Sequence, residues 1–184
     1  PRLGQLADIV KPQKVIPTAV EFVDIAGLVA GASKGEGLGN KFLAGIREVD
    51  AITFVLRAFH DDDVPGPSDP LEHLRIVEIE LALADLEAIE RQVERRRKQA
   101  KADKAVAAEL AALEPAFDAL AEGTPLYRAA LTAEQRELLV PWFLLTNKPV
   151  LAVVNVSDAE LDSIDEKVAR VSAELPGAEV VGMC

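Results

Sequence analysis

Short runs of β-branched and apolar residues recur along the chain, and each ends in a polar or glycine-rich segment. They cover Val20 to Ile25, Ala51 to Ala58 and Val150 to Asn155, and a shorter run covers Glu179 to Val181. Apolar runs of this length without alternation are typical of strands that are buried on both faces. We therefore predict four strands of a parallel sheet with both faces covered.

Helical periodicity separates these runs. Leu38, Phe42 and Ile46 would share one face of a helix over residues 38–49. A second helix is indicated by Ile164, Val168, Val171 and Leu175, at spacings of four, three and four, with Ser163 and Glu166 as its expected capping box. Strands that alternate with helices predict an α/β domain built on a parallel sheet.

The middle of the chain has a different, heptad-like pattern. One apolar seam runs through Ile76, Ile79, Leu83, Leu86 and Val93, and another through Val106, Leu110, Leu113, Phe117 and Leu120. The link between them, residues 95–104, is basic and has no glycine or proline. We predict two long antiparallel helices, an α-helical coiled coil with a charged tip.

This coiled coil divides the expected domains. Residues 72–145 would be a helical insertion, between the first part of the α/β domain (residues 1–71) and its remainder (residues 146–184). Within the insertion, Thr132 and Gln135 predict the capping box of a further helix. Pro141 either bends that helix or belongs to a separate turn.

Composition narrows the class of protein. The 184 residues carry 20 Lys and Arg against 31 Asp and Glu, a net charge of −11, and 49% of them are hydrophobic. The single cysteine, Cys184, cannot form an internal disulfide, so we expect a reducing, cytoplasmic setting. No apolar run is long enough for a membrane span, and the acidic balance disfavours DNA as a partner.

A nucleic-acid partner would need a local basic patch, and the predicted tip offers one. The candidate contacts to ribosomal RNA are Arg95, Arg96, Arg97, Lys98 and Lys101. Such contacts would weaken steeply with salt. The alternative is a solvated coiled-coil tip without a ligand.

A nucleotide-binding pattern follows the first predicted strand. Asp24 and Gly27 form Asp-x-x-Gly at the carboxyl end of that strand, where parallel sheets bind ligands. Asp24 could hold Mg²⁺, usually through water, and Gly27 could donate its backbone N–H to a terminal phosphate. The candidate switch loop that follows contains Leu28, Gly31, Gly35, Gly37 and Gly39. The alternative is a strand followed by a surface loop.

A second piece, Asn155-Val156-Ser157-Asp158, follows the strand that begins at Val150. GTP-binding domains carry Asn-Lys-x-Asp at this position, where the Asp carboxylate accepts hydrogen bonds from guanine. Val156 replaces the Lys. Because both motifs fall at strand ends on one edge of the sheet, we predict a nucleotide site made of Asp24, Gly27, Asn155, Val156 and Asp158.

A longer match then makes the pattern specific. The segment Asp24 to Leu43, with Ile46 to Ile52 after it, resembles the Obg-like ATPases of the YchF family. Residues 80–87 and 144–150 also match that family, so the resemblance covers nearly the whole chain. It implies a P-loop NTPase of the translation-factor class with a coiled-coil insertion and a TGS domain, which binds ATP in preference to GTP and associates with ribosomes.

The resemblance assigns roles to the candidate residues. It implies that Asp24 and Gly27 contact Mg²⁺ and the γ-phosphate, and that Asn155 and Val156 hold the base. Asp158 stands where the family usually has Glu, and Asp is the residue of a guanine-specific site, so a GTPase stays an alternative. Leu28 stands where Ras-like GTPases have a Gln that orients the attacking water. The catalytic residue therefore stays unknown, or Leu28 only packs the loop.

One expected motif does not occur. The chain has no Gly-x-x-x-x-Gly-Lys-[Ser/Thr] phosphate loop. By the resemblance, that loop would precede Pro1 and the TGS domain would follow Cys184. We expect the 184-residue chain alone to bind nucleotide weakly and not to hydrolyse it. The runner-up function is a non-catalytic interaction module in which the helical hairpin does the binding.

Overall fold

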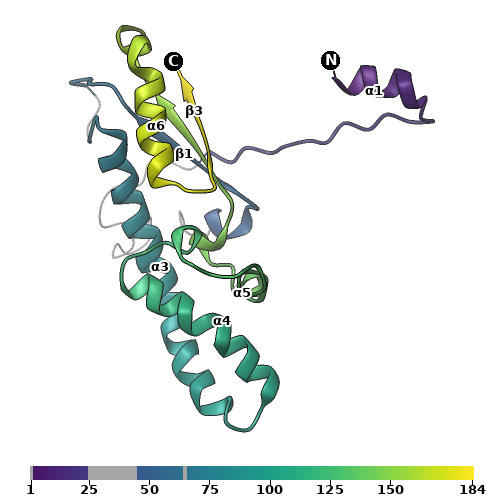
Figure 1. The fold of residues 1–184 in the computed structure, drawn as a ribbon, viewed down its shortest axis with the longest axis vertical. Coiled ribbons are helices and arrows are strands. Elements are labelled where there is room, and N and C mark those ends of the chain that lie inside the picture. The colour runs from purple at the N-terminus through teal and green to yellow at the C-terminus, as the bar shows by residue number, and fades with distance from the viewer. Residues whose placement is uncertain (1, 25–44, 64–65) are drawn as a thin grey trace.

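The computed structural model describes residues 2–24, 45–63 and 66–184 (Figure 1). Its larger elements are α1 (Arg2–Val10), β1 (Ile52–Arg57), α3 (Pro70–Gln99), α4 (Lys104–Ala121), α5 (Ala133–Leu139), β2 (Val150–Asn155), α6 (Ile164–Glu174) and β3 (Glu179–Met183). Residues 45–48 are also helical, within the helix predicted over 38–49, whose first part lies outside the described residues. No helix in these ranges is both long enough and apolar enough to cross a membrane.

The three described strands form one parallel sheet in the order β1-β2-β3. Ile52 pairs with Val150 and Arg57 with Asn155, and Asn155 in turn pairs with Met183. The last residues of all three strands therefore lie at one edge. This arrangement confirms the α/β fold class and three of the four predicted strands.

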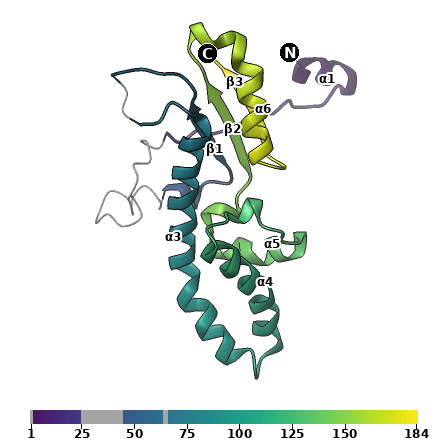
Figure 2. The same cartoon turned by 60° about the vertical axis from the view of Figure 1, so that its left-hand side comes forward.

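One face of the sheet carries the first hydrophobic core. Ile52, Phe54 and Leu56 of β1 pack there with α3, while α6 packs on β2 and β3 (Figure 2). On the opposite face Thr53 and Val55 of β1 are exposed, Val55 to 57%, whereas Leu151 and Val153 of β2 are partly buried. For the described residues the prediction of a sheet covered on both faces is therefore wrong, because both helices lie on the same side.

The strand predicted over Val20 to Ile25 is also wrong. Residues 20–24 are extended but pair with no described strand, and Ile25 lies outside the described residues. Val20 is 74% and Phe22 81% exposed. A strand is stable only when a neighbour satisfies its backbone N–H and C=O groups, and here none does. Figure 1 shows this extended segment leading away from α1.

The two predicted antiparallel helices are confirmed as α3 and α4, which form the hairpin that projects from the sheet (Figure 1). Each begins at an Asp, because Asp69 accepts from Leu71 N–H and Asp103 from Ala105 N–H. The turn between them lies at residues 100–103. The hairpin enters after β1 and returns to β2, so the insertion separates two adjacent strands.

The seam predicted on the first helix is partly wrong. Ile79 and Leu83 are 53% and 39% exposed. The buried face instead contains Leu74, Val77, Leu81, Ile89 and Val93. With 30 residues α3 is longer than α4, which has 18, so the first half of α3 packs on the sheet and follows no heptad seam.

Short elements after α4 complete a second core at the base of the hairpin. They are the 3₁₀ turns η2 (Leu126–Arg128) and η3 (Val140–Trp142), together with α5. Leu145 of the following turn, η4 (Leu145–Asn147), packs in the core of the sheet instead. The capping box of Thr132 and Gln135 is confirmed, and Pro141 belongs to the separate turn η3. The capping box predicted at Ser163 is wrong, because Ser163 Oγ donates to the carbonyl of Glu160 at 2.9 Å instead.

Candidate functional site

The carboxyl ends of the three strands meet at one edge of the sheet. The backbone N–H of Ala58 donates to the carbonyl of Asn155 at 2.8 Å. The backbone N–H of Val156 donates to the carbonyl of Met183 at 2.9 Å. These bonds extend the ladder one residue past β1 and β2. The segment Asn155 to Asp158 therefore starts at the edge where parallel sheets bind ligands.

Asp158 is exposed and begins the 3₁₀ turn η5 (Asp158–Ser163). Its Oδ1 accepts a hydrogen bond from Cys184 Sγ at 2.9 Å. The contact with the Asp158 carboxylate raises the pKa of the Cys184 thiol. From the sequence alone, Cys184 served only to exclude an internal disulfide. The parallel register of β2 with β3 is what places it beside Asp158.

Lys167 of α6 holds the loop that follows β2 at this edge of the sheet. Lys167 Nζ donates to the carbonyl of Ala58 at 2.5 Å and to Glu160 Oε1 at 2.7 Å. Ser157 Oγ donates to Glu160 Oε2 at 3.0 Å. The hydrogen bond from Lys167 lowers the pKa of Glu160. One lysine thus ties the end of β1 to the loop after β2, and the backbone of Asn155 to Asp158 is fixed without a ligand.

The side chain of Val156 is buried and faces the core of the sheet. Val156 is 3% exposed and belongs to the hydrophobic core of the sheet. The alternation of buried residues Ala152 and Val154 continues past the end of β2 to Val156. Only the backbone of Val156 therefore lies at the edge, and its contact with a base stays a prediction.

The structure does not bring Asp24 to this edge by strand pairing. Asp24 is exposed on the unpaired segment, and its carboxylate makes no hydrogen bond or ion pair with the described residues. The other candidates of the switch, Gly27, Leu28, Gly31, Gly35, Gly37 and Gly39, lie outside the described residues. How Asp24 and Gly27 lie relative to Asn155 thus stays a prediction.

No protein cage for a metal is formed in the described ranges, where no three His, Cys, Asp or Glu side chains converge. Mg²⁺ that accompanies a nucleotide needs fewer protein ligands, because phosphates and water supply most of its ligands and one or two carboxylates suffice. The exposed carboxylate of Asp24 fits that role. The residues present are compatible with a magnesium–nucleotide complex and not with a metal bound by side chains alone.

The basic side chains at the hairpin tip fall into two groups, those in ion pairs within the hairpin and those without a partner among the described residues. Arg96 pairs with Glu109 at 2.7 Å and stacks 4.5 Å above the Trp142 ring, and Arg97 pairs with Glu114 at 2.8 Å. These two arginines join α3 to α4, and Arg96 also joins it to the turn η3. The other three predicted contacts, Arg95, Lys98 and Lys101, are exposed and have no partner among the described residues. Of the five predicted contacts, these three are the ones that are available to an external anion.

Sequence reasoning missed a buried charged centre at the base of the hairpin. Asp85 of α3 is fully buried, and its Oδ1 accepts from Leu145 N–H and its Oδ2 from Thr146 N–H, each at 2.8 Å. Thr146 Oγ1 also donates to Oδ2 at 2.8 Å. Burial raises the pKa of Asp85, and these hydrogen bonds oppose the shift. Asp85 thereby caps η4, 60 residues away in the sequence.

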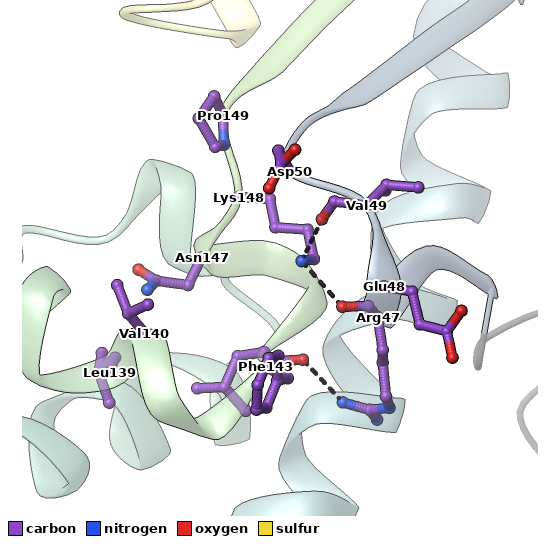
Figure 3. A pocket seen from close by; sticks show the side chains of 11 residues that line it. Arg47, Glu48, Val49, Asp50, Leu139, Val140, Phe143, Asn147, Lys148 and Pro149 are labelled. Atoms are coloured by element: carbon purple, nitrogen blue, oxygen red, sulfur yellow. Dashed lines mark hydrogen bonds between the residues drawn. The ribbon is translucent and has the colours of Figure 1, made fainter. Parts of the chain in front are cut away.

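Arg47, from the helical residues before β1, approaches this centre. Its guanidinium lies 3.8 Å from Asp85 Oδ1 and donates to the carbonyl of Phe143 at 3.0 Å (Figure 3). Phe143 has φ of 51°, a left-handed conformation that costs a non-glycine residue about 1–2 kcal/mol. Lys148 Nζ donates to the carbonyls of Arg47 and Val49 at 3.2 and 2.6 Å. A pocket of about 230 Å³ lies between these segments.

Comparison with known proteins decides the family. No protein-family model matches the chain. The chain is 45% identical to proteins named "Ribosome-binding ATPase YchF" from Haemophilus influenzae and Bacillus subtilis, and each match covers all of this chain and 52% of the relative. A solved structure, "Structure of the Schizosaccharomyces pombe YchF GTPase", matches with a TM-score of 0.73 and 34% identity over 99% of this chain and 52% of that chain. The chain belongs to the YchF family.

The YchF match confirms the resemblance inferred from the segment after Asp24. It also agrees with the fold, since the solved YchF structure matches this chain over 99% of its length. The chain spans about half the length of the curated YchF proteins it matches. The names of these proteins differ in the nucleotide that they state, because the curated relatives are called ATPases and the solved structure is called a GTPase.

Proposed function

We propose that this chain supplies part of the nucleotide-binding domain and the helical hairpin of a P-loop NTPase that hydrolyses ATP and associates with ribosomes. The observation that carries the proposal is the 45% identity over the whole chain to proteins named ribosome-binding ATPases. The proposed domains are residues 1–71 with 146–184, and the insertion 72–145. The presence of two hydrophobic cores supports two units, with the first half of α3 and Leu145 of the insertion packed in the core of the sheet.

In this proposal the nucleotide lies at the carboxyl edge of the sheet. Asn155 and Asp158 would contact the base, together with the backbone of Val156, and Asp24 and Gly27 would lie at the phosphates. Mg²⁺ is the proposed cofactor and would neutralise charge on the phosphates, with Asp24 as its carboxylate, directly or through water. The ladder that fixes Asn155 and Val156 supports an edge that is rigid before the base arrives.

A second candidate is specificity for GTP. Asp158 favours it, because a carboxylate of this length is the guanine-binding residue of GTPases, and a solved relative is named a GTPase. We place ATP first because Val156 replaces the Lys that covers guanine, and because several curated relatives are named ATPases. Competition between ATP and GTP for the full-length protein decides between them.

The proposed partner is ribosomal RNA, which places the protein in the cytoplasm. Residues 91–104 carry seven basic and two acidic side chains on a chain whose net charge is −11. The free cations Arg95, Lys98 and Lys101 support a phosphate contact at this tip. We propose neither a membrane nor DNA as a partner of this protein.

The test compares two proteins, the 184-residue chain and a full-length YchF protein that carries its sequence. A titration with fluorescent ATP should show tight, magnesium-dependent binding by the full-length protein, and weak binding by the chain, which lacks the phosphate loop. Micromolar affinity of the chain alone would contradict this expectation. Co-sedimentation with ribosomes should depend on ATP. Binding by the hairpin that is independent of nucleotide would instead favour a non-catalytic module.

A further inference from the structure

Three segments that are distant in the sequence meet at Asp85. They are the helical residues 45–48, the middle of α3, and the stretch from Phe143 to Thr146 that leads into β2. Arg47 joins the first segment to both others, through the ion pair with Asp85 and the hydrogen bond to the Phe143 carbonyl. Figure 3 shows the bond to Phe143 and the bonds from Lys148 that hold the same segment.

This contact lies where the two hydrophobic cores meet, because Leu145, which donates its N–H to Asp85, packs in the core of the sheet together with Ile46. Ile46, next to Arg47, is 5% exposed and packs in the core of the sheet. Leu144, next to Phe143, is 2% exposed and packs in the core of the hairpin base. A shift of the helix at 45–48 relative to the hairpin therefore strains the Arg47 contacts directly.

Arg47 supplies the positive charge beside the buried Asp85. Among the described residues, Arg47 is the only cation within ion-pair distance of the buried Asp85, whose other recorded partners are neutral N–H and O–H donors. A buried carboxylate that loses its counter-charge is disfavoured. Phe143, whose carbonyl Arg47 binds, has the left-handed backbone conformation that is typical of sites held by their surroundings. If the Arg47 side chain moves away, its contacts with the Asp85 carboxylate and with the Phe143 carbonyl are both lost.

We propose that Arg47 is a positioning residue that couples the helix at residues 45–48 to the base of the helical hairpin, so that the direction of the hairpin depends on the bound nucleotide. This inference rests on the proposed nucleotide-switch function, because the helix at 45–48 follows the predicted switch loop in the sequence. In one state the guanidinium bridges Asp85 and Phe143. In the other it leaves both, and the hairpin base repacks around Asp85.

The experiment measures the distance between two spin labels in the full-length protein by pulsed electron paramagnetic resonance. The labels are attached at Ala102→Cys on the hairpin tip and Ser172→Cys on α6, both at exposed positions, with native cysteines replaced by Ser. Wild type, Arg47→Met and Arg47→Lys are compared without nucleotide and with a non-hydrolysable ATP analogue and Mg²⁺. Affinity for ATP is measured on the same samples.

We expect a nucleotide-dependent shift of the distance distribution in the wild type, a loss of that shift in Arg47→Met, and partial rescue in Arg47→Lys. The affinity for ATP should change less than threefold. The matched control is Arg97→Met, which removes an exposed ion pair of the same hairpin, side chains 49% and 41% exposed, and should shift as the wild type does. If Arg47→Met does not fold, Arg47→Met/Asp85→Asn removes both charges together and should also lose the shift.

A shift in Arg47→Met equal to that of the wild type would overturn the inference. So would a wild type that binds ATP without any shift, and in that case the proposed function would stand. A wild type that binds no ATP would overturn the proposed function and the inference with it.

Discussion

Gly182 of β3 lies directly against α6, and its missing side chain leaves the space that Ile164 fills. A Cβ atom at this position would lie 2.5 Å from Ile164 Cγ1 and 2.6 Å from its Cδ1. We predict that Gly182→Ala destabilises the protein by about 1–3 kcal/mol, because an overpacked contact must shift α6 or the strand. Urea unfolding measures this. Gly45→Ala is the control, since nothing lies within 4 Å of its Cβ and alanine favours the helix there.

His73 of α3 provides a pH-dependent contribution to stability. Its Nδ1 accepts from the backbone N–H of Arg57 at 3.4 Å, which requires the neutral ring. Burial, followed by the charge of Arg57, lowers the pKa of His73. A base whose pKa is lowered by folding contributes stability above its unfolded pKa of about 6.5, and that stability is lost as the pH falls.

We therefore predict that His73→Gln reduces the loss of stability between pH 7.5 and pH 5. The measurement is the free energy of unfolding at several pH values, in a His60→Gln background, so that only one imidazole differs between the two proteins. An equal pH dependence of both proteins would show that His73 is not buried as described.

At the scale of elements, the hairpin tip is the part whose charge can be tested without disturbing the fold. Arg95 and Lys98 are exposed and have no partner among the described residues, whereas Arg96 and Arg97 hold the hairpin together. Arg95→Gln/Lys98→Gln should weaken co-sedimentation of the full-length protein with ribosomes and reduce the slope of log K against log salt by about 1 to 2. Lys11→Gln/Lys14→Gln removes equal charge at another exposed site and should leave the slope unchanged.

The elements that the sequence pattern predicted well are those whose stability is local or repeated. β2 begins and ends where its apolar run does, and α3 and α4 follow from two long helical periods separated by a basic link. The segment Val20 to Asp24 has an equally good strand pattern. It is not a strand because pairing depends on a neighbour, which no property of its own residues reveals.

The candidate site was predictable only in part for the same reason. Asn155 and Asp158 could be placed at a strand end from their own motif, and they lie there. Val156 could not, because only the packing of Ala152 and Val154 shows that its side chain faces the core. The centre at Asp85 joins residues about 40 and 60 positions apart, and such contacts leave no periodic signal in one sequence.

The whole molecule depends on a charged network that joins its two hydrophobic cores. Arg128 of η2 pairs with Glu78 of α3 at 3.1 Å and with Glu174 of α6 at 2.6 Å, and Tyr127 Oη donates to Glu78 at 3.0 Å. Glu78 is 5% exposed. Its burial raises its pKa, and the charge of Arg128 opposes the shift. Arg128 thus neutralises a carboxylate that sits between the sheet and the hairpin.

We predict that Arg128→Met destabilises the protein by about 3 kcal/mol at pH 7.5, because an unpaired buried carboxylate is left behind. The loss should be smaller at pH 5. An acid whose folded pKa lies above its unfolded value contributes most stability below the unfolded value, and this contribution disappears as the pH rises through the folded pKa. Arg170→Met, which breaks the exposed pair with Asp69, should cost at most about 1 kcal/mol at either pH. Unfolding at both pH values distinguishes the two, and a loss from Arg128→Met that does not change with pH would mean that the effect comes from packing and not from the charge of Glu78.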